Sequence, residues 1–210
     1  APNFNVDKAT VVRAAVQNAD GVFSDVVSQT YFVTTSNLAQ YQDLTVVSLV
    51  TNPENLFDPD TGIYVTGNQY LDWKNSDAYN PDKSVWDTDN LTNYFSKGKE
   101  WEREAALTVF QDGKAVVDQN IGIRIKGASS RNSAQKNFNL YARSTYGASK
   151  ISYPLIPDNY AADGTLIDQY DSVSLRAVSE EGRLRDGFSQ KLLTDRTNLT
   201  KQDMQSCVVF

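Results

Sequence analysis

A strict alternation of apolar and other residues near the middle of the chain constrains the fold more than any other feature of this sequence. Ile121, Ile123 and Ile125 are each separated by a single residue. Because successive side chains of a β-strand point to opposite faces, the isoleucines face a core, and Arg124 and Lys126 share the other face. The pattern is typical of an antiparallel sheet with one buried face.

Further strands are expected on both sides of this segment. Asp112 and Gly113 form a hairpin-turn signal, and a short apolar run at 44–50 is typical of a well-buried strand. Apolar residues at helical spacing around charged neighbours predict one long helix at 181–197. The expected fold class is α+β, a mainly antiparallel β-sheet with one long helix. The remaining predicted strands are 105–110, 115–117, 122–126, 138–143 and 172–176.

The beginning of the chain reads as a separate β segment. Residues 9–16 and 26–33 are β-branched and apolar, and Asp20 and Gly21 between them favour a turn. Two strands cannot bury a core alone, so this segment is interpreted as a short, partial β-sandwich-like tail. A polar linker follows, and we place a domain boundary there, with a first unit at 1–37 and a second at 38–210. Residues 51–100 are rich in turn signals and are expected to form a long loop.

Composition excludes several classes of function. The 210 residues contain no histidine and one cysteine, Cys207, so Ser-His-Asp catalysis, histidine-ligated zinc and an intrachain disulfide are impossible. The net charge of −6 argues against non-specific nucleic-acid binding. No apolar run reaches the roughly 20 residues of a membrane span.

Small residues and cations follow the central strand. The sequence Gly-Ile-Arg-Ile-Lys-Gly-Ala-Ser-Ser-Arg at 122–131 lets backbone amides approach an anion, and Arg124, Lys126, Arg131 and Lys136 supply positive charge. Neither a Walker loop nor a dinucleotide fingerprint is present. From the residues alone, a hairpin with a solvated basic face is the favoured interpretation.

An ordered series of motifs resembles the CotH kinase family, which is named for a spore-coat protein and is similar in fold to atypical protein kinases. Leu175, Arg176, Arg185 and Asp186 match the later part of the pattern, although a helical Arg-Asp pair is more often structural. The earlier motifs lie at residues 47–58, 62–65, 101–104, 122–131 and 136–141.

The resemblance covers about residues 44–210 and implies transfer of the γ-phosphoryl group of ATP, with Mg or Mn, to Ser or Thr of surface or coat proteins. It makes Lys136 the candidate for the nucleotide-phosphate lysine, with Arg124, Arg131 and Lys126 as further cofactor contacts. Residues 10–14 and 24–31 resemble a fibronectin-III-like module found in chitobiases. Together these features imply an exported bacterial protein at the cell surface.

The catalytic and metal-holding acids of that family would follow a strand that begins at Cys207. The chain thus resembles the N-terminal part of a truncated domain. Its catalytic residues stay unknown, and by itself it is expected to be inactive.

The alternative is a non-catalytic adhesion or carbohydrate-binding β module of the cell surface, because fold resemblance does not establish activity. Two acidic features carry less weight. Asp58 and Asp60 are attributed to turn chemistry rather than to calcium binding. Glu100 and Glu102 are expected to lie on a surface strand beside a buried Trp101 rather than to form a glycosidase pair.

Overall fold

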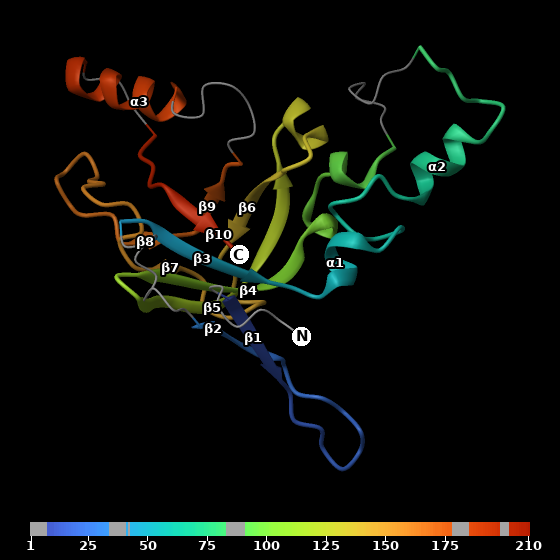
Figure 1. Ribbon diagram of the computed structural model, residues 1–210, viewed down its shortest axis with the longest axis horizontal. Coiled ribbons are helices and arrows are strands. Elements are labelled where there is room, and N and C mark those ends of the chain that lie inside the picture. The colour runs from blue at the N-terminus through green and yellow to red at the C-terminus, as the bar shows by residue number, and fades with distance from the viewer. Residues whose placement is uncertain (1–7, 34–40, 42, 83–90, 178–184, 198–201) are drawn as a thin grey trace.

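The computed structural model describes residues 8–33, 41, 43–82, 91–177, 185–197 and 202–210. Its centre is a curled six-stranded sheet in the order β10-β3-β4-β5-β6-β9 (Figure 1). Neighbouring strands are antiparallel, except that β10 is parallel to β3. The strands are β3 (Thr45–Val50), β4 (Arg103–Gln111), β5 (Lys114–Lys126), β6 (Asn137–Tyr141), β9 (Ser172–Leu175) and β10 (Cys207–Val209).

A two-residue turn joins the two longest strands of the sheet. Asp112 and Gly113 have φ angles of 50° and 72°. Two positive φ angles are what a type I′ hairpin turn requires, so the predicted turn is confirmed. The two strands predicted at 115–117 and 122–126 are one continuous strand, β5, of 13 residues. Pairing with β4 from Lys114 to Ile123 holds β5 extended through the polar residues 118–120, which the pattern had left as a break.

The core lies on one face of the sheet. Ile121, Ile123 and Ile125 are at most 4% exposed, and Leu107 and Leu140 on the flanking strands pack into the same cluster. Arg124 and Lys126 lie on the opposite face, as the alternation predicted. Removing these apolar side chains from water stabilises the sheet by about 25 cal/mol per Å² buried.

The expected α+β class with one long helix is wrong. Within the described residues the protein is mostly β, and its α-helices are short: α1 (Pro53–Phe57), α2 (Asn68–Lys74) and α3 (Arg185–Arg196). The predicted start of the long helix, 181–184, lies outside the described residues. Phe188, Leu192 and Leu193 recur at helical spacing in α3 but are exposed, so their spacing does not indicate a helix packed on the core.

The region expected to be a long loop contains several short helical turns. Besides α1 and α2, it holds the 3-10 turns η2 (Asn93–Phe95) and η3 (Lys99–Trp101), and a further one, η4 (Ser129–Asn132), follows β5. The surface strand expected around Trp101 is therefore wrong, because Glu100 and Trp101 lie in η3. A small second sheet pairs β7 (Ile151–Ser152) with β8 (Gln169–Tyr170).

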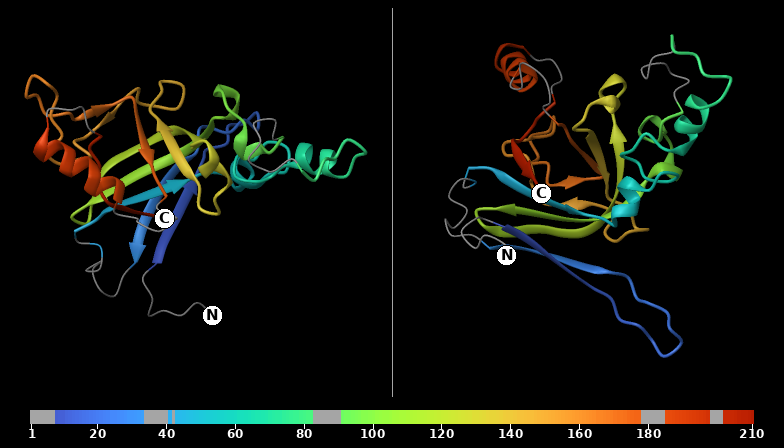
Figure 2. Two further views of the ribbon diagram at one scale, coloured as in Figure 1. Left: turned by 90° about the horizontal axis from the view of Figure 1, so that it is seen from above. Right: turned by 45° about the vertical axis from the view of Figure 1, so that its right-hand side comes forward.

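The strands β1 (Lys8–Ala14) and β2 (Val27–Val33) form an antiparallel hairpin, as predicted. Its far end projects away from the sheet (Figure 2). From the middle of β2, Thr30 Oγ1 lies 2.7 Å from Ser48 Oγ, and nearer its end Phe32 makes edge contacts with Phe110 and Phe210. The hairpin thus packs on the non-core face of β3 and β4. The proposed boundary between residues 37 and 38 lies outside the described residues.

None of the helices in the described segments is long and apolar enough to span a membrane.

Candidate functional site

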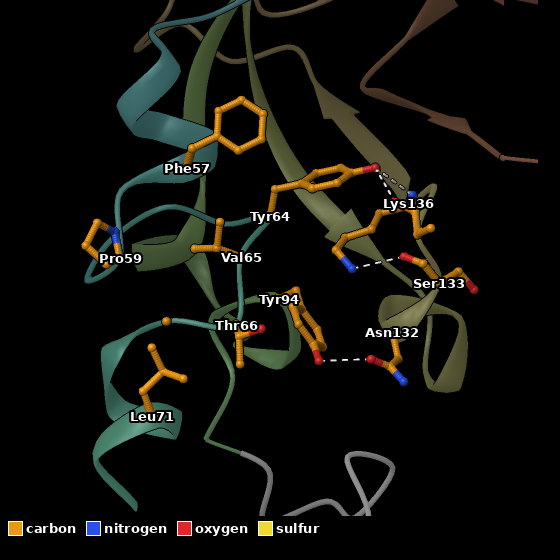
Figure 3. A pocket seen from close by; sticks show the side chains of 12 residues that line it. Phe57, Pro59, Tyr64, Val65, Thr66, Leu71, Tyr94, Asn132, Ser133 and Lys136 are labelled. Carbon is orange, nitrogen blue, oxygen red and sulfur yellow. Dashed lines mark hydrogen bonds between the residues drawn. The ribbon is translucent and has the colours of Figure 1, made fainter. Parts of the chain in front are cut away.

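A pocket of about 560 Å³ opens between the 57–67 segment, η2 and the 132–136 loop (Figure 3). Its volume lies in the range of about 300–1,000 Å³ that is usual for small-molecule sites. Three aromatic rings form much of its wall, and Lys136 is the charged residue among those lining it. The lining residues are Phe57, Pro59, Tyr64, Val65, Thr66, Gly67, Leu71, Tyr94, Asn132, Ser133, Ala134 and Lys136.

A tight acidic turn positions the first wall of the pocket. Asp58 Oδ1 accepts hydrogen bonds from the backbone N–H groups of Asp60 and Thr61, at 2.9 and 2.8 Å, and these bonds lower the pKa of Asp58. Asp58 is therefore engaged in turn chemistry, as predicted. The turn returns the chain so that Tyr64 N–H bonds to Leu56 O, and the Tyr64 ring stacks on Phe138 of the sheet.

Lys136 lies at the floor of this pocket, between the rings of Tyr64 and Tyr94 (Figure 3). Its Nζ lies 5.2 Å from the Tyr64 ring centroid and 4.1 Å from that of Tyr94. It donates to Arg131 O at 2.7 Å and to Ser133 O at 3.0 Å. Burial lowers the pKa of Lys136, because the low-dielectric surroundings disfavour the ammonium ion. The lysine is thus not a solvated side chain at a strand edge.

Arg131 is buried beside the pocket and ties two loops together. Its Nε donates to Gly127 O at 2.6 Å, and its Nη1 donates to Tyr94 O and Ser96 O, both at 3.0 Å. Burial, with a smaller contribution from the nearby positive charge of Arg124, lowers the pKa of Arg131. Three carbonyl acceptors occupy the side chain, so its clearest role is to hold the 127–133 loop against η2.

The structure does not bring all four predicted cations into one site. Arg124 and Lys126 lie on the non-core face of β5, whereas Lys136 contacts Tyr64, which stacks on Phe138 of the core face. The four cations therefore form two pairs. Lys136 lines the pocket and Arg131 braces the loop beside it, whereas Arg124 and Lys126 lie on the outer face of the sheet.

Arg124, one of the outer pair, belongs to a cluster built around a buried carboxylate, Glu102, whose side chain is 0% exposed. Arg143 donates to it twice, from Nε at 2.7 Å and from Nη2 at 3.1 Å, and these bonds raise the pKa of Arg143. Arg124 Nε lies 3.6 Å from the same carboxylate. Gly122 makes room for Glu102, because a Cβ there would lie 2.5 Å from Glu102 Oε1.

Sequence reasoning did not identify the residues that complete the pocket and the cluster around Glu102. Tyr64 and Tyr94 fall in or beside turns of the region read as a loop, where no periodic pattern marks them. Glu102 lies in the 101–104 motif, but the only role weighed for its carboxylate was as a partner of Glu100. Arg143, however, shares the strand-face alternation of Asn139 and Tyr141, which was a signal that it could join Arg124.

Chemically, the pocket can bind a small ligand that has a flat apolar part and one anionic group. The flat part would lie against the aromatic rings, and the anionic group would face Lys136.

Comparison of the chain with protein-family models, with curated proteins and with solved structures gave no match.

Proposed function

We propose that this chain is the ATP-binding part of an exported, CotH-like bacterial protein kinase that transfers phosphate to Ser or Thr of cell-surface or spore-coat proteins. The base of ATP lies against the aromatic wall of the pocket, and Lys136 faces its phosphates. The divalent metal that accompanies ATP, Mg or Mn, neutralises phosphate charge. The resemblance of the motif series supports the family, and the pocket supports the nucleotide.

One observation carries the proposal: an ammonium group sits at the floor of an aromatic pocket of suitable size. Lys136 Nζ uses two of its three protons on loop carbonyls, which aims the group and leaves one N–H for a ligand oxygen. The charge has no acidic partner among the described residues within ion-pair distance. A phosphate would supply that missing counter-charge.

Calorimetric titration of Mg-ATP and Mn-ATP into the 210-residue protein tests the proposal. We expect binding, and we expect Lys136→Met to weaken it by about tenfold or more, because a charge-assisted hydrogen bond contributes about 1.5–3 kcal/mol. Lys114→Met is the matched control, since Lys114 is an exposed lysine at the β4–β5 turn, remote from the pocket.

Loss of Lys136 also removes two hydrogen bonds from the loop and can unfold it, so a second variant is needed. Phe57 lines the pocket but is 58% exposed, so Phe57→Ala should leave folding intact and weaken ATP binding. The proposal would be contradicted if titrating ATP into the wild-type protein gave no more heat than titrating it into buffer. It would also be contradicted if ATP affinity were unchanged in both Lys136→Met and Phe57→Ala.

A second candidate, a non-catalytic polysaccharide-binding module, is favoured by the exposed ring of Phe57 at the pocket rim, since aromatic rings offer apolar faces to sugars. Retention on immobilised polysaccharide that is lost in Phe57→Ala, together with no heat change on adding ATP, would support this function over the first.

A further inference from the structure

The outer face of the sheet carries a second cluster of polar groups, on the side opposite the core. It consists of Arg124 and Lys126 of β5, Asn139 and Tyr141 of β6, and Ser174 of β9, and we call it the outer cluster. Arg124 pairs with Asn139, and Asn139 pairs with Ser174, so these three lie in a row across adjacent strands. Lys126 lies about 7 Å from Arg124 along β5, on the same face.

The guanidinium of Arg124 is held in position, but its N–H groups donate no hydrogen bond to a described residue. Its Cζ lies 4.3 Å from the centroid of the Tyr141 ring, and its Nε lies 3.6 Å from Glu102 Oε2. Arg124 makes no hydrogen bond to any residue that the structure describes, and its Nε is buried without an acceptor. The Arg124 side chain is 25% exposed, and its guanidinium is held by a ring and a buried carboxylate while donating to no described residue, so it is preorganised to bind an oxyanion through two parallel bonds.

Two further donors of the outer cluster point to the same ligand. Lys126 Nζ donates to Ser174 Oγ at 2.7 Å, and Ser174 Oγ donates to Asn139 Oδ1 at 2.8 Å. Asn139 Nδ2 in turn donates to Tyr141 Oη at 3.1 Å. This chain of bonds fixes the amide of Asn139, occupies one proton of Lys126 and makes the Tyr141 hydroxyl an acceptor. With respect to the residues that the structure describes, the O–H of Tyr141 and two N–H groups of Lys126 remain free to donate.

The charges identify the ligand class. Arg143 is neutralised by its two hydrogen bonds to Glu102, which leaves Arg124 and Lys126 as two positive charges on the open face. A phosphate monoester carries close to two negative charges at neutral pH and three acceptor oxygens, whereas a carboxylate carries one charge and two oxygens. We therefore propose that the outer cluster binds a phosphate monoester, at a site separate from the ATP pocket. The inference does not rest on the proposed kinase function.

The experiment titrates inorganic phosphate and glycerol 2-phosphate into the 210-residue protein at low salt, with acetate as the carboxylate probe. We expect both phosphates to bind and acetate to bind at least tenfold more weakly. Arg124→Gln should weaken phosphate binding by about tenfold or more. Arg124→Lys keeps the charge but loses the planar fork, so it should also weaken binding several-fold.

Further variants distinguish phosphate binding at the outer cluster from a general effect of the protein's net charge. Lys126→Gln alters a side chain that makes one hydrogen bond, to the exposed Ser174, so it tests the site even if Arg124→Gln does not fold. Tyr141→Phe keeps the ring under Arg124 and removes only the hydroxyl. Lys114→Gln changes the net charge equally at a remote exposed position and should leave affinity unchanged. Affinity equal to wild type in Arg124→Gln or Lys126→Gln, or equal affinity for acetate and phosphate, would overturn the proposal.

Two outcomes separate this site from the ATP pocket. Mg-ATP should leave phosphate affinity unchanged, and Phe57→Ala should bind phosphate as the wild type does. Competition between Mg-ATP and phosphate in the wild-type protein would mean one shared site and would overturn the inference. Because the probes carry no base, phosphate binding without ATP binding would support the outer cluster while contradicting the proposed kinase function.

Discussion

At the scale of single residues, the buried charges of this protein are satisfied in two different ways. Glu102 is held by Arg143 in a two-bond ion pair, whereas Lys136 is held by two backbone carbonyls and two aromatic rings. Breaking a buried ion pair leaves an uncompensated charge, which is why Gly122 and Arg143 matter to Glu102. Lys136 has no ionic partner among the residues that the structure describes, so it can accept an external anion.

The carboxylate of Asp58 gives a pH prediction at this scale. Hydrogen bonds from Thr61 and Asp60 lower its pKa below the ordinary 3.8. A lowered folded-state pKa means that the ion contributes stability above pH 3.8, which is lost as the pH falls through the folded-state value. Asp58→Asn keeps the acceptor oxygen but does not titrate. We expect wild-type protein to keep its stability advantage over Asp58→Asn from neutral pH down to about 3.8 and to lose it as the pH falls further, through the lowered folded-state pKa.

Urea unfolding followed by circular dichroism across this pH range measures the difference. Asp20→Asn is the control, since the carboxylate of Asp20 accepts no hydrogen bond from the described residues. A wild-type minus Asp58→Asn difference that stays constant with pH, or that grows in acid, would show that the turn does not depend on the charge.

At the scale of elements, alternation identified strand faces correctly but helical spacing misjudged α3. Strand faces are defined by the backbone, because a pleated strand has a period of two wherever it is placed. The apolar spacing of Phe188, Leu192 and Leu193 shows only that the segment can be amphipathic. Whether a helix face is buried depends on what else reaches it, and in α3 that face is exposed.

Phe188→Ser tests this difference between helix and sheet. Phe188 is 68% exposed, so its replacement should change the free energy of unfolding by no more than about 0.5 kcal/mol. Leu140→Ala, in the core of β6, should cost about 2–5 kcal/mol. Urea denaturation of both variants provides the comparison, and a Phe188→Ser variant as unstable as Leu140→Ala would mean that α3 is packed in solution.

At the scale of the whole molecule, contacts spread along both strands join the β1–β2 hairpin to the rest of the protein, including the hydrogen bonds from Arg13 to Asn52 and from Gln29 to Asp118. Phe32 supplies two further contacts, with ring centroids 5.0 Å from Phe110 and 5.3 Å from Phe210. Since aromatic pairs contribute about 0.5–1.5 kcal/mol each beyond their buried area, Phe32→Ala should detach the hairpin more often without unfolding the sheet.

Amide hydrogen exchange can separate these two events. In Phe32→Ala we expect exchange in β1 and β2 to accelerate by about tenfold or more, while amides of β4 and β5 stay as protected as in the wild type. Tyr31→Ala is the neighbouring control, because Tyr31 is 53% exposed. Equal acceleration in the hairpin and the sheet would mean that they unfold as one unit.

The sequence by itself determined those features that depend on a few neighbouring residues: most strand segments of the six-stranded sheet, the isoleucine face of β5, the Asp112-Gly113 turn and the turn at Asp58. The tertiary structure alone decided which cations share a site. Arg131 and Lys136 are buried because the 127–136 loop meets η2 and Tyr64, which lie more than 30 residues earlier in the chain. Arg124 and Lys126 stay on the outer face. Burial and desolvation arise from contacts between distant segments, and no local pattern encodes them.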